Sequence, residues 1–151
     1  MVDVGHNGKV NAQYNVAAAG SLPTRLAAMQ RRKMFAAFLD FGPTPDDVIL
    51  DIGATSDRSY SHSNYLEAWY PHKAKLTAAG IDEGAAFLET AYPGVKFVLA
   101  DGRDLPFTDN SFDYVHSSAV LEHVGNRGQQ LAFISEWGGR FAARTPELTL
   151  L

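Results

Sequence analysis

The chain has 151 residues, the length of one domain, and its 46% hydrophobic and 20% charged residues are typical of a folded globular protein. Thirteen basic and seventeen acidic side chains give a formal net charge of −4, which excludes a general electrostatic attraction to nucleic acid or anionic membranes. The sequence has no cysteine, which excludes disulfides, thiolate metal sites and a cysteine nucleophile and favours a cytoplasmic location; no apolar run reaches the ~18 residues of a membrane span.

The N-terminal segment divides into two parts. Residues 1–23 show no sustained hydrophobic period, so we expect a loosely ordered leader before a single domain over residues 24–151. From Thr24, a possible N-cap, apolar residues recur near one side of an amphipathic helix that extends to Phe41. Gly42 and the prolines that follow it end this helix.

Short β-branched segments then alternate with helical ones. Strands are predicted at 47–53, 75–82, 96–101 and 112–120, and helices at 63–70, 83–92 and 126–137. The first two of these helices each stop at a proline. At the start of the first one, Asn64 and Glu67 have the spacing of a capping box. This alternation predicts an α/β fold of three αβα layers with a mostly parallel sheet, in which ligands bind beyond the carboxyl ends of the strands.

Three of the predicted strands end in acid or glycine: Asp51-Ile52-Gly53, Gly80-Ile81-Asp82 and Ala100-Asp101-Gly102. A carboxylate after the second strand of such a sheet can accept hydrogen bonds from both hydroxyls of a ribose, which makes Asp82 the first ligand candidate. Asp82 is equally compatible with capping the helix that starts at Glu83. Asp101, taken alone, is more typical of an Asx turn before a glycine.

Two segments carry a family resemblance: VILDIGATSDRSYSHSNYLEAWYPHKAKLTAAGIDE and VKFVLADGRDLPFTDNSFDYVHSSAVLEHVGNR. In this order their motifs resemble the N-terminal half of a class I S-adenosylmethionine-dependent methyltransferase of the methyltransferase-domain type. The similarity runs from about Arg25 to about Trp137. It implies a Rossmann-like fold with strand order 3-2-1-4, S-adenosylmethionine as cofactor and S-adenosylhomocysteine as product.

The resemblance also implies roles for the strand-end residues. The loop after the first strand would line the methionine part of the cofactor, Asp82 would bind the ribose, and Asp101 would accept from the adenine amino group beside Arg103. Serines just past the fourth strand would lie near the sulfonium. The cofactor-binding residues expected in this way are Asp51, Gly53, Ala54, Thr55, Ser56, Asp82, Asp101, Gly102, Arg103, Ser117 and Ser118.

The methyl transfer that the resemblance implies is a displacement at the activated methyl carbon of a sulfonium. It mainly requires the protein to position the acceptor. His123, oriented by Glu122, is a weak candidate for a general base, and a packing or capping role is the favoured alternative. The remaining histidines lack ligand spacing, so no metal site is expected. The acceptor is not identified by the sequence, although a small molecule is favoured over nucleic acid.

Three departures from the family pattern qualify these expectations. Ala54 to Asp57 stand where the family loop carries further glycines, and the segment Arg58–Lys73 adds residues before the second strand. Aromatic side chains in that segment are expected in the core ahead of a pocket wall. The chain also has room for four or five strands where the complete fold has seven, with too few residues after His123 for a full helix, so we expect a truncated domain.

Truncation predicts an exposed edge on the fourth strand. The final stretch, residues 138–151, is either a poor fifth strand or a tail. We expect either this tail or a second copy of the chain to cover the edge, the latter giving a homo-oligomer. A catalytically silent module that keeps the fold is the alternative function; a nicotinamide-dependent dehydrogenase is disfavoured because the glycine fingerprint is absent.

Overall fold

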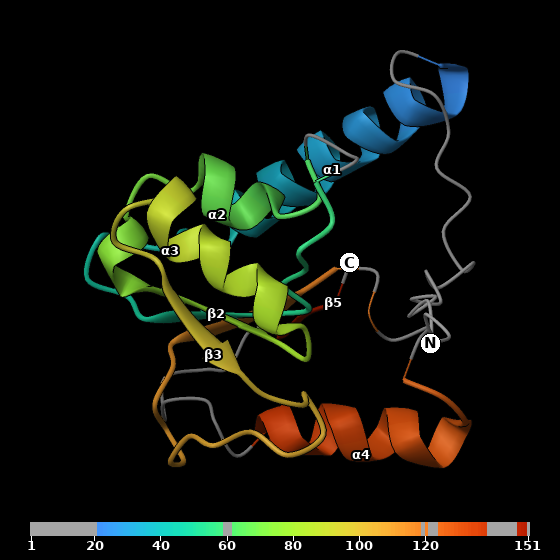
Figure 1. Cartoon of the computed structure of the whole chain (residues 1–151). Helices are drawn as coiled ribbons and strands as arrows, with labels where there is room; N and C mark the ends of the chain where they lie inside the picture. Colours follow the sequence, from blue (N-terminus) through green and yellow to red (C-terminus); the bar gives the residue numbers. More distant parts are fainter. Residues whose placement is uncertain (1–20, 59–61, 119, 121–123, 139–147, 151) are drawn as a thin grey trace, which may run out of the picture.

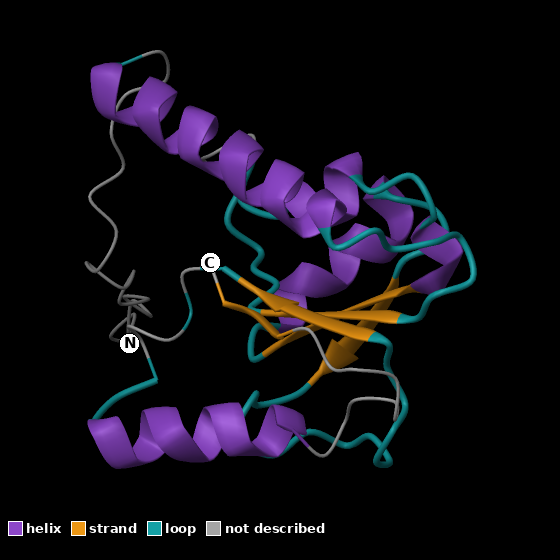
Figure 2. Ribbon diagram, turned by 180° about the vertical axis from the view of Figure 1, so that it is seen from behind, coloured by secondary structure: helices purple, strands orange, loops and turns teal. Residues whose placement is uncertain are grey.

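A computed structural model, which describes residues 21–58, 62–118, 120, 124–138 and 148–150, shows a parallel sheet between two helical layers (Figures 1 and 2). The sheet has five strands in the order β3-β2-β1-β4-β5, and every pairing is parallel. The predicted Rossmann-like architecture and the order 3-2-1-4 are therefore confirmed. The strands are β1 (Ile49–Ile52), β2 (Leu76–Gly80), β3 (Lys96–Leu99), β4 (Tyr114–Ser117) and β5 (Leu148–Leu150).

Helices cover both faces of the sheet. Helices α1, α2 and α3 lie over one face, and α4 lies over the other (Figure 1). The part of α1 nearer its N-terminus extends beyond the sheet (Figure 2). The helical elements are α1 (Leu22–Asp40), α2 (Tyr65–Trp69), η1 (Lys73–Lys75), η2 (Glu83–Ala86), α3 (Phe87–Ala91) and α4 (Arg127–Gly138).

The central strand β1 contributes to two hydrophobic cores because successive side chains of a strand point to opposite faces. Ile49 packs with Phe38 and Leu66 beneath α1 and α2. Leu50, its neighbour, packs with Trp137 on the α4 side. All four residues of β1 are consequently buried, which fits a strand at the centre of a doubly covered sheet.

The helix starts differ from the predicted caps. Helix α1 begins at Leu22, after Ser21, so Thr24 is inside the first turn, where its hydroxyl lies 2.8 Å from that of Ser21. Asn64 does precede α2, but its side chain makes no cap hydrogen bond. Glu67 is fully buried, so the predicted capping box is wrong: α2 turns Glu67 into the core.

The fourth strand has a partner on each side, because β5 pairs with it in the register Val115↔Leu148 and Ser117↔Leu150. The expected covering by the tail is thus confirmed, and β4 has its neighbour without a second copy of the chain. Helix α4 spans 12 residues, so the expectation of too little chain for a helix before the fifth strand is wrong. Residues 1–20, most of the predicted leader, lie outside the described residues.

Candidate functional site

The glycine turn after β1 is held by the neighbouring strand. Gly53 has a φ of +113°, a conformation that side chains rarely adopt. Its amide and that of Ala54 both donate to the carbonyl of Ala79, at 2.8 and 3.0 Å. A Cβ atom at Gly53 would overlap the side chain of Val120. Glycine is therefore required here by backbone conformation and packing, whether or not a ligand approaches.

The loop that follows is tied to the start of α2. The amide of Thr55 donates to Oδ1 of Asn64 at 3.0 Å, and Nδ2 of Asn64 donates to the carbonyl of Thr55 at 2.9 Å. Ala54 is buried, and the amide of Asp57 donates to the Thr55 hydroxyl at 3.1 Å. Side chains thus fix a loop that the family pattern would build from glycines.

Asp82 follows β2 and joins the first loop to the second. Its Oδ2 accepts from the amide of Ser56 at 3.0 Å and from the Ser56 hydroxyl, while Oδ1 accepts from the amide of Gly84 at 2.9 Å. The hydrogen bonds from Ser56 lower the pKa of Asp82 below its ordinary value. The capping role is therefore present, since Gly84 belongs to η2, and the carboxylate is ionised at the carboxyl end of the sheet.

Asp101 follows β3 and is paired with Arg103. Nη2 of Arg103 lies 2.5 Å from Oδ2, and the amide of Arg103 donates to Oδ1 at 2.9 Å, which is the Asx turn that the sequence favoured. The hydrogen bonds from Arg103 lower the pKa of Asp101. The side chain of Asp101 remains 39% exposed. Gly102 between them lies against α4, where a Cβ atom would overlap the ring of Phe133.

The end of β4 carries the two predicted serines. Ser117 is buried, and its hydroxyl donates to the carbonyl of Ile52 at 3.0 Å. Ser118, the next residue, is half-buried. The general-base candidate His123 and its neighbour Glu122 lie outside the described residues.

A buried polar cluster lies directly below these strand ends, and sequence reasoning missed most of it. Asp51 and His116 face each other across β1 and β4, with Oδ1 and Nδ1 2.5 Å apart. His116 Nε2 lies 2.8 Å from the Tyr65 hydroxyl, and Glu67 is buried beside this group. Asp51 was expected at the cofactor, and the structure places it in the core beneath α1 and α2.

Burial shifts the pKa values in this cluster. Loss of hydration raises the pKa of Asp51 to about 6 and lowers that of His116 to about 4. Burial, reinforced by the charge of Asp51, also raises the pKa of Glu67 well above its ordinary value. At neutral pH the imidazole of His116 is therefore neutral, while burial makes the protonated form of Glu67 more favourable than it is in water.

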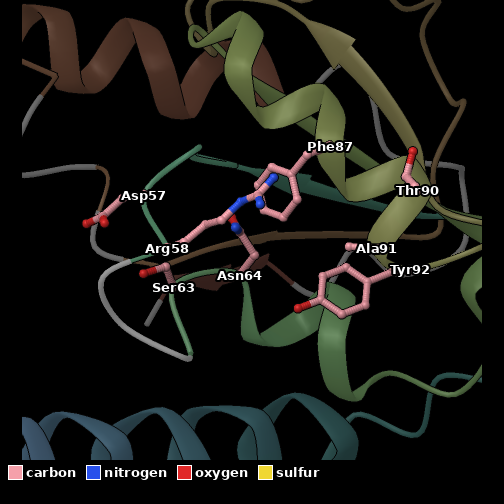
Figure 3. A pocket seen from close by; sticks show the side chains of 8 residues that line it. All are labelled: Asp57, Arg58, Ser63, Asn64, Phe87, Thr90, Ala91 and Tyr92. Atoms are coloured by element: carbon pink, nitrogen blue, oxygen red, sulfur yellow. The ribbon is translucent and has the colours of Figure 1, made fainter. Parts of the chain in front are cut away.

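A separate cavity of about 560 Å³ lies beside the candidate site, between the loop after β1 and α3 (Figure 3). The guanidinium of Arg58 stacks 3.9 Å from the ring centroid of Phe87, and Asn64 and Tyr92 also line the cavity. None of the predicted cofactor-binding residues lines this cavity. The buried Tyr65 and Tyr70 pack in the core, so the expectation for the aromatic side chains of the added segment is confirmed for these two.

Within the described ranges, no cluster of three or more histidine or acidic side chains could hold a metal ion. Among the same residues, no helix combines the length and apolarity needed to cross a bilayer.

The sheet order and the two helical layers define the Rossmann-like αβα class, with the ends of β3, β2, β1 and β4 adjacent at one edge. Residues 50–137, more than half of the chain, match the methyltransferase domain family, and the chain belongs to this family. No curated protein sequence matches the chain.

Solved structures support the fold. The SAM dependent methyltransferase from Aquifex aeolicus has a TM-score of 0.57 at 18% identity, over 80% of this chain and 62% of that one. A SAM-dependent methyltransferase from Methanosarcina mazei has a TM-score of 0.52 at 27% identity, over 69% and 51%. Geranyl diphosphate C-methyltransferase from Streptomyces coelicolor A3(2), solved with Mg²⁺, geranyl diphosphate and S-adenosyl-L-homocysteine, has a TM-score of 0.57 at 13% identity, over 78% and 42%. The chain therefore spans about half the length of these proteins.

Proposed function

We propose that this domain binds S-adenosylmethionine across the ends of β1 to β4 and transfers its methyl group to a small-molecule acceptor in the cytoplasm. The observation that carries the proposal is the pair of ionised, accessible carboxylates, Asp82 and Asp101, after two adjacent strands of a methyltransferase-domain fold. Two such acceptors beside one glycine turn suit a ligand with a ribose and an adenine amino group.

Each candidate residue has a role in this proposal. Asp82 would accept from the ribose hydroxyls in place of the Ser56 hydroxyl, which it now binds. Asp101 would accept from the adenine amino group, with the Arg103 side chain moved from its present ion pair to the border of the ring. The methionine part would lie along the loop Gly53, Ala54, Thr55 and Ser56, next to Gly102, Ser117 and Ser118.

The cofactor, when bound, supplies an electrophilic methyl group on a positively charged sulfur. The protein's own residues would orient the acceptor and exclude water, which are the main requirements of an in-line displacement. Within this proposal, His123 is the candidate for removing a proton from the acceptor, and Glu122 is its proposed orienting neighbour.

A second candidate function is a non-catalytic module that keeps the fold. It is favoured by the present partners of the two carboxylates. Ser56 and Gly84 already donate hydrogen bonds to the carboxylate of Asp82, and Arg103 donates to that of Asp101.

Titration with S-adenosylhomocysteine by calorimetry distinguishes the two candidates. We expect binding by the wild type and a loss of about 10-fold to 100-fold in affinity for Asp82→Ala, the value of one or two charge-assisted hydrogen bonds. Asp46→Ala is the matched control, because Asp46 is an exposed acid before β1, at the opposite end of the sheet. The melting temperature of each variant checks that loss of the η2 cap has not unfolded the domain.

Absence of binding by a folded wild type would overturn the cofactor proposal and favour the silent module. Equal losses for the two variants would show that Asp82 has no particular role. Turnover is a separate measurement, made with radiolabelled methyl donor and a panel of small hydroxyl, amine and thiol acceptors.

A further inference from the structure

The cavity beside the candidate site has two walls that come from different parts of the chain. One wall is the loop after β1 together with the start of α2, and it carries Arg58, Ser63 and Asn64. All three belong to the segment Arg58–Lys73, which departs from the family pattern in length. The other wall is α3 with Tyr92, the residue after it (Figure 3). The volume of about 560 Å³ is in the range of cavities that hold small organic molecules.

Arg58 brings a positive charge to this cavity. Its guanidinium lies over the ring of Phe87, 3.9 Å from the centroid, so an uncharged side chain supports it. No ion pair joins Arg58 to an acid in the part of the chain that the structure describes. Asp57 also lines the cavity, but its side chain points away from the Arg58–Phe87 stack (Figure 3). A guanidinium that lies over a ring keeps the N–H groups at its edge for an anion.

The remainder of the cavity suits the apolar part of a ligand. The methyl group of Ala91 and the ring of Tyr92 line it on the α3 side. The Asn64 side chain on the opposite wall is fixed, because its Oδ1 and Nδ2 both bond the backbone of Thr55. One guanidinium balances one negative charge, and a dianion would bring an excess of charge close to Asp57. These features together favour a planar monoanion, namely a carboxylate on an aromatic ring.

We propose that the cavity is a second ligand site, which binds a small aromatic carboxylate with its charged group at the edge of Arg58 and its ring against Ala91 and Tyr92. This site is separate from the proposed cofactor site, none of whose residues lines the cavity. The aromatic carboxylate therefore binds beside S-adenosylmethionine and not in its place.

Both walls of the cavity are hydrogen-bonded to the same carboxylate, that of Asp82. The amide and the hydroxyl of Ser56, two residues before Arg58, donate to its Oδ2. The amide of Gly84 donates to Oδ1, and Gly84 belongs to η2, which continues directly into α3. Asp82 therefore links the loop wall to the α3 wall.

This link predicts that the aromatic carboxylate and the cofactor oppose each other, a step that rests on the proposed function. In that function a ribose replaces the Ser56 hydroxyl on Asp82, which removes one of the hydrogen bonds between the walls. A ligand that fits the present spacing of the walls favours the state in which Ser56 binds Asp82. It should therefore weaken cofactor binding, and the cofactor should weaken its binding by the same factor.

The ligand site can be tested without the cofactor, by NMR titration of ¹⁵N-labelled protein with benzoate and with benzamide, its neutral isostere. We expect benzoate to shift the amide signals of both walls with a Kd of about 1 mM, and benzamide to bind at least about 10-fold more weakly. Equal affinities for the two probes would overturn the anion site. Shifts confined to other parts of the chain would also overturn it.

Arg58→Gln should reduce benzoate binding to the level of benzamide, because it removes the charge and the guanidinium. Arg25→Gln is the matched control, since Arg25 is an exposed arginine of α1 that does not line the cavity. Ala91→Trp keeps every charge and fills the cavity from the exposed end of α3, so it should abolish binding. The melting temperature of each variant checks that it is folded. Unchanged benzoate binding by either folded cavity variant would overturn the proposal.

The opposition between the two ligands can be measured by calorimetric titration with S-adenosylhomocysteine. One titration contains benzoate at about 10 times its Kd, and the other contains benzamide at the same concentration. We expect S-adenosylhomocysteine to bind about 5-fold more weakly in benzoate, and equally in both solutions for Arg58→Gln. Equal affinities in the wild type would overturn the coupling through Asp82. Failure of S-adenosylhomocysteine to bind would overturn the proposed function together with the coupling, whereas the benzoate titration would still decide whether the cavity is a ligand site.

Discussion

Two pairs of carboxyl groups lie near the carboxyl ends of the strands, and their surroundings shift their pKa values in opposite directions. Asp82 and Asp101 lie just past the ends of β2 and β3, where backbone amides and the side chains of neighbours lower their pKa. Asp51 within β1 and Glu67 on α2 are buried between sheet and helices, and their pKa is raised. The same functional group is held ionised in one place, while burial favours its protonated form in the other.

The difference follows from position along the strand. A residue inside a strand of a doubly covered parallel sheet points into a helical layer, as Asp51 does. A residue one or two positions beyond the strand reaches the amides of the next turn, as Asp82 reaches Gly84. Carboxylates that stay ionised and can bind a ligand are therefore expected past the end of a strand. Carboxyl groups with a raised pKa are expected just before it.

The largest effect should come from deleting the partner of the buried acid. His116→Ala leaves the Asp51 carboxylate and the Tyr65 hydroxyl without their partner and opens a cavity next to Phe38. We expect a loss of about 3–5 kcal/mol in the free energy of unfolding at pH 7, measured by urea denaturation. A loss below about 1 kcal/mol would mean that water or a neighbour replaces the imidazole. The buried carboxyl groups would then depend on their partners no more than the accessible ones do.

A second effect, of similar size, should depend on pH. The raised pKa of Asp51, about 6 against 3.8, contributes stability that is present below 3.8 and is lost as the pH rises through 6. Asp51→Asn removes this contribution, so the stability of the variant relative to the wild type should increase by roughly 3 kcal/mol from pH 4 to pH 7. Urea denaturation of both proteins across this range tests it, and parallel pH profiles would contradict the assignment of the titrating group to Asp51.

The architecture was predictable because it depends on patterns repeated along the chain. Strands and helices alternate, with helix-breaking residues between them, which predicts the layers. The order of the strands came from the family resemblance, which the motifs of residues 96–124 carry most specifically. The positions of Asp82 and Asp101 past their strands were predictable for the same reason. Their present partners were predictable only in part, since Gly84 and Arg103 are two residues away and Ser56 is 26 residues away in sequence.

The buried cluster was not predictable because it depends on register between segments far apart. Asp51 and His116 are 65 residues apart and meet only because β1 and β4 pair in one register. Glu67 fits a local capping pattern with Asn64, yet packing of α2 on the sheet turns it inward. Gly102 likewise resembles a residue that clears space for a ligand, whereas the ring of Phe133 on α4 explains it. In each case a distant contact decides between two local interpretations.

The smallest effect should come from deleting the partner of an accessible acid. Arg103→Ala removes the ion pair of Asp101, but both side chains are well exposed, at 47% and 39%, and solvent screens their interaction. We expect no measurable change in the melting temperature at pH 7, together with a rise in the pKa of Asp101 toward its ordinary value, followed by ¹³C-carboxyl NMR. Any small contribution of the lowered pKa is present above the ordinary value of Asp101 and is lost as the pH falls through the lowered one, so no difference should appear in acid either. A clear drop in melting temperature would show that Asp101 is built into the fold as firmly as Asp51, and the distinction between ligand-binding and titrating acids would no longer hold.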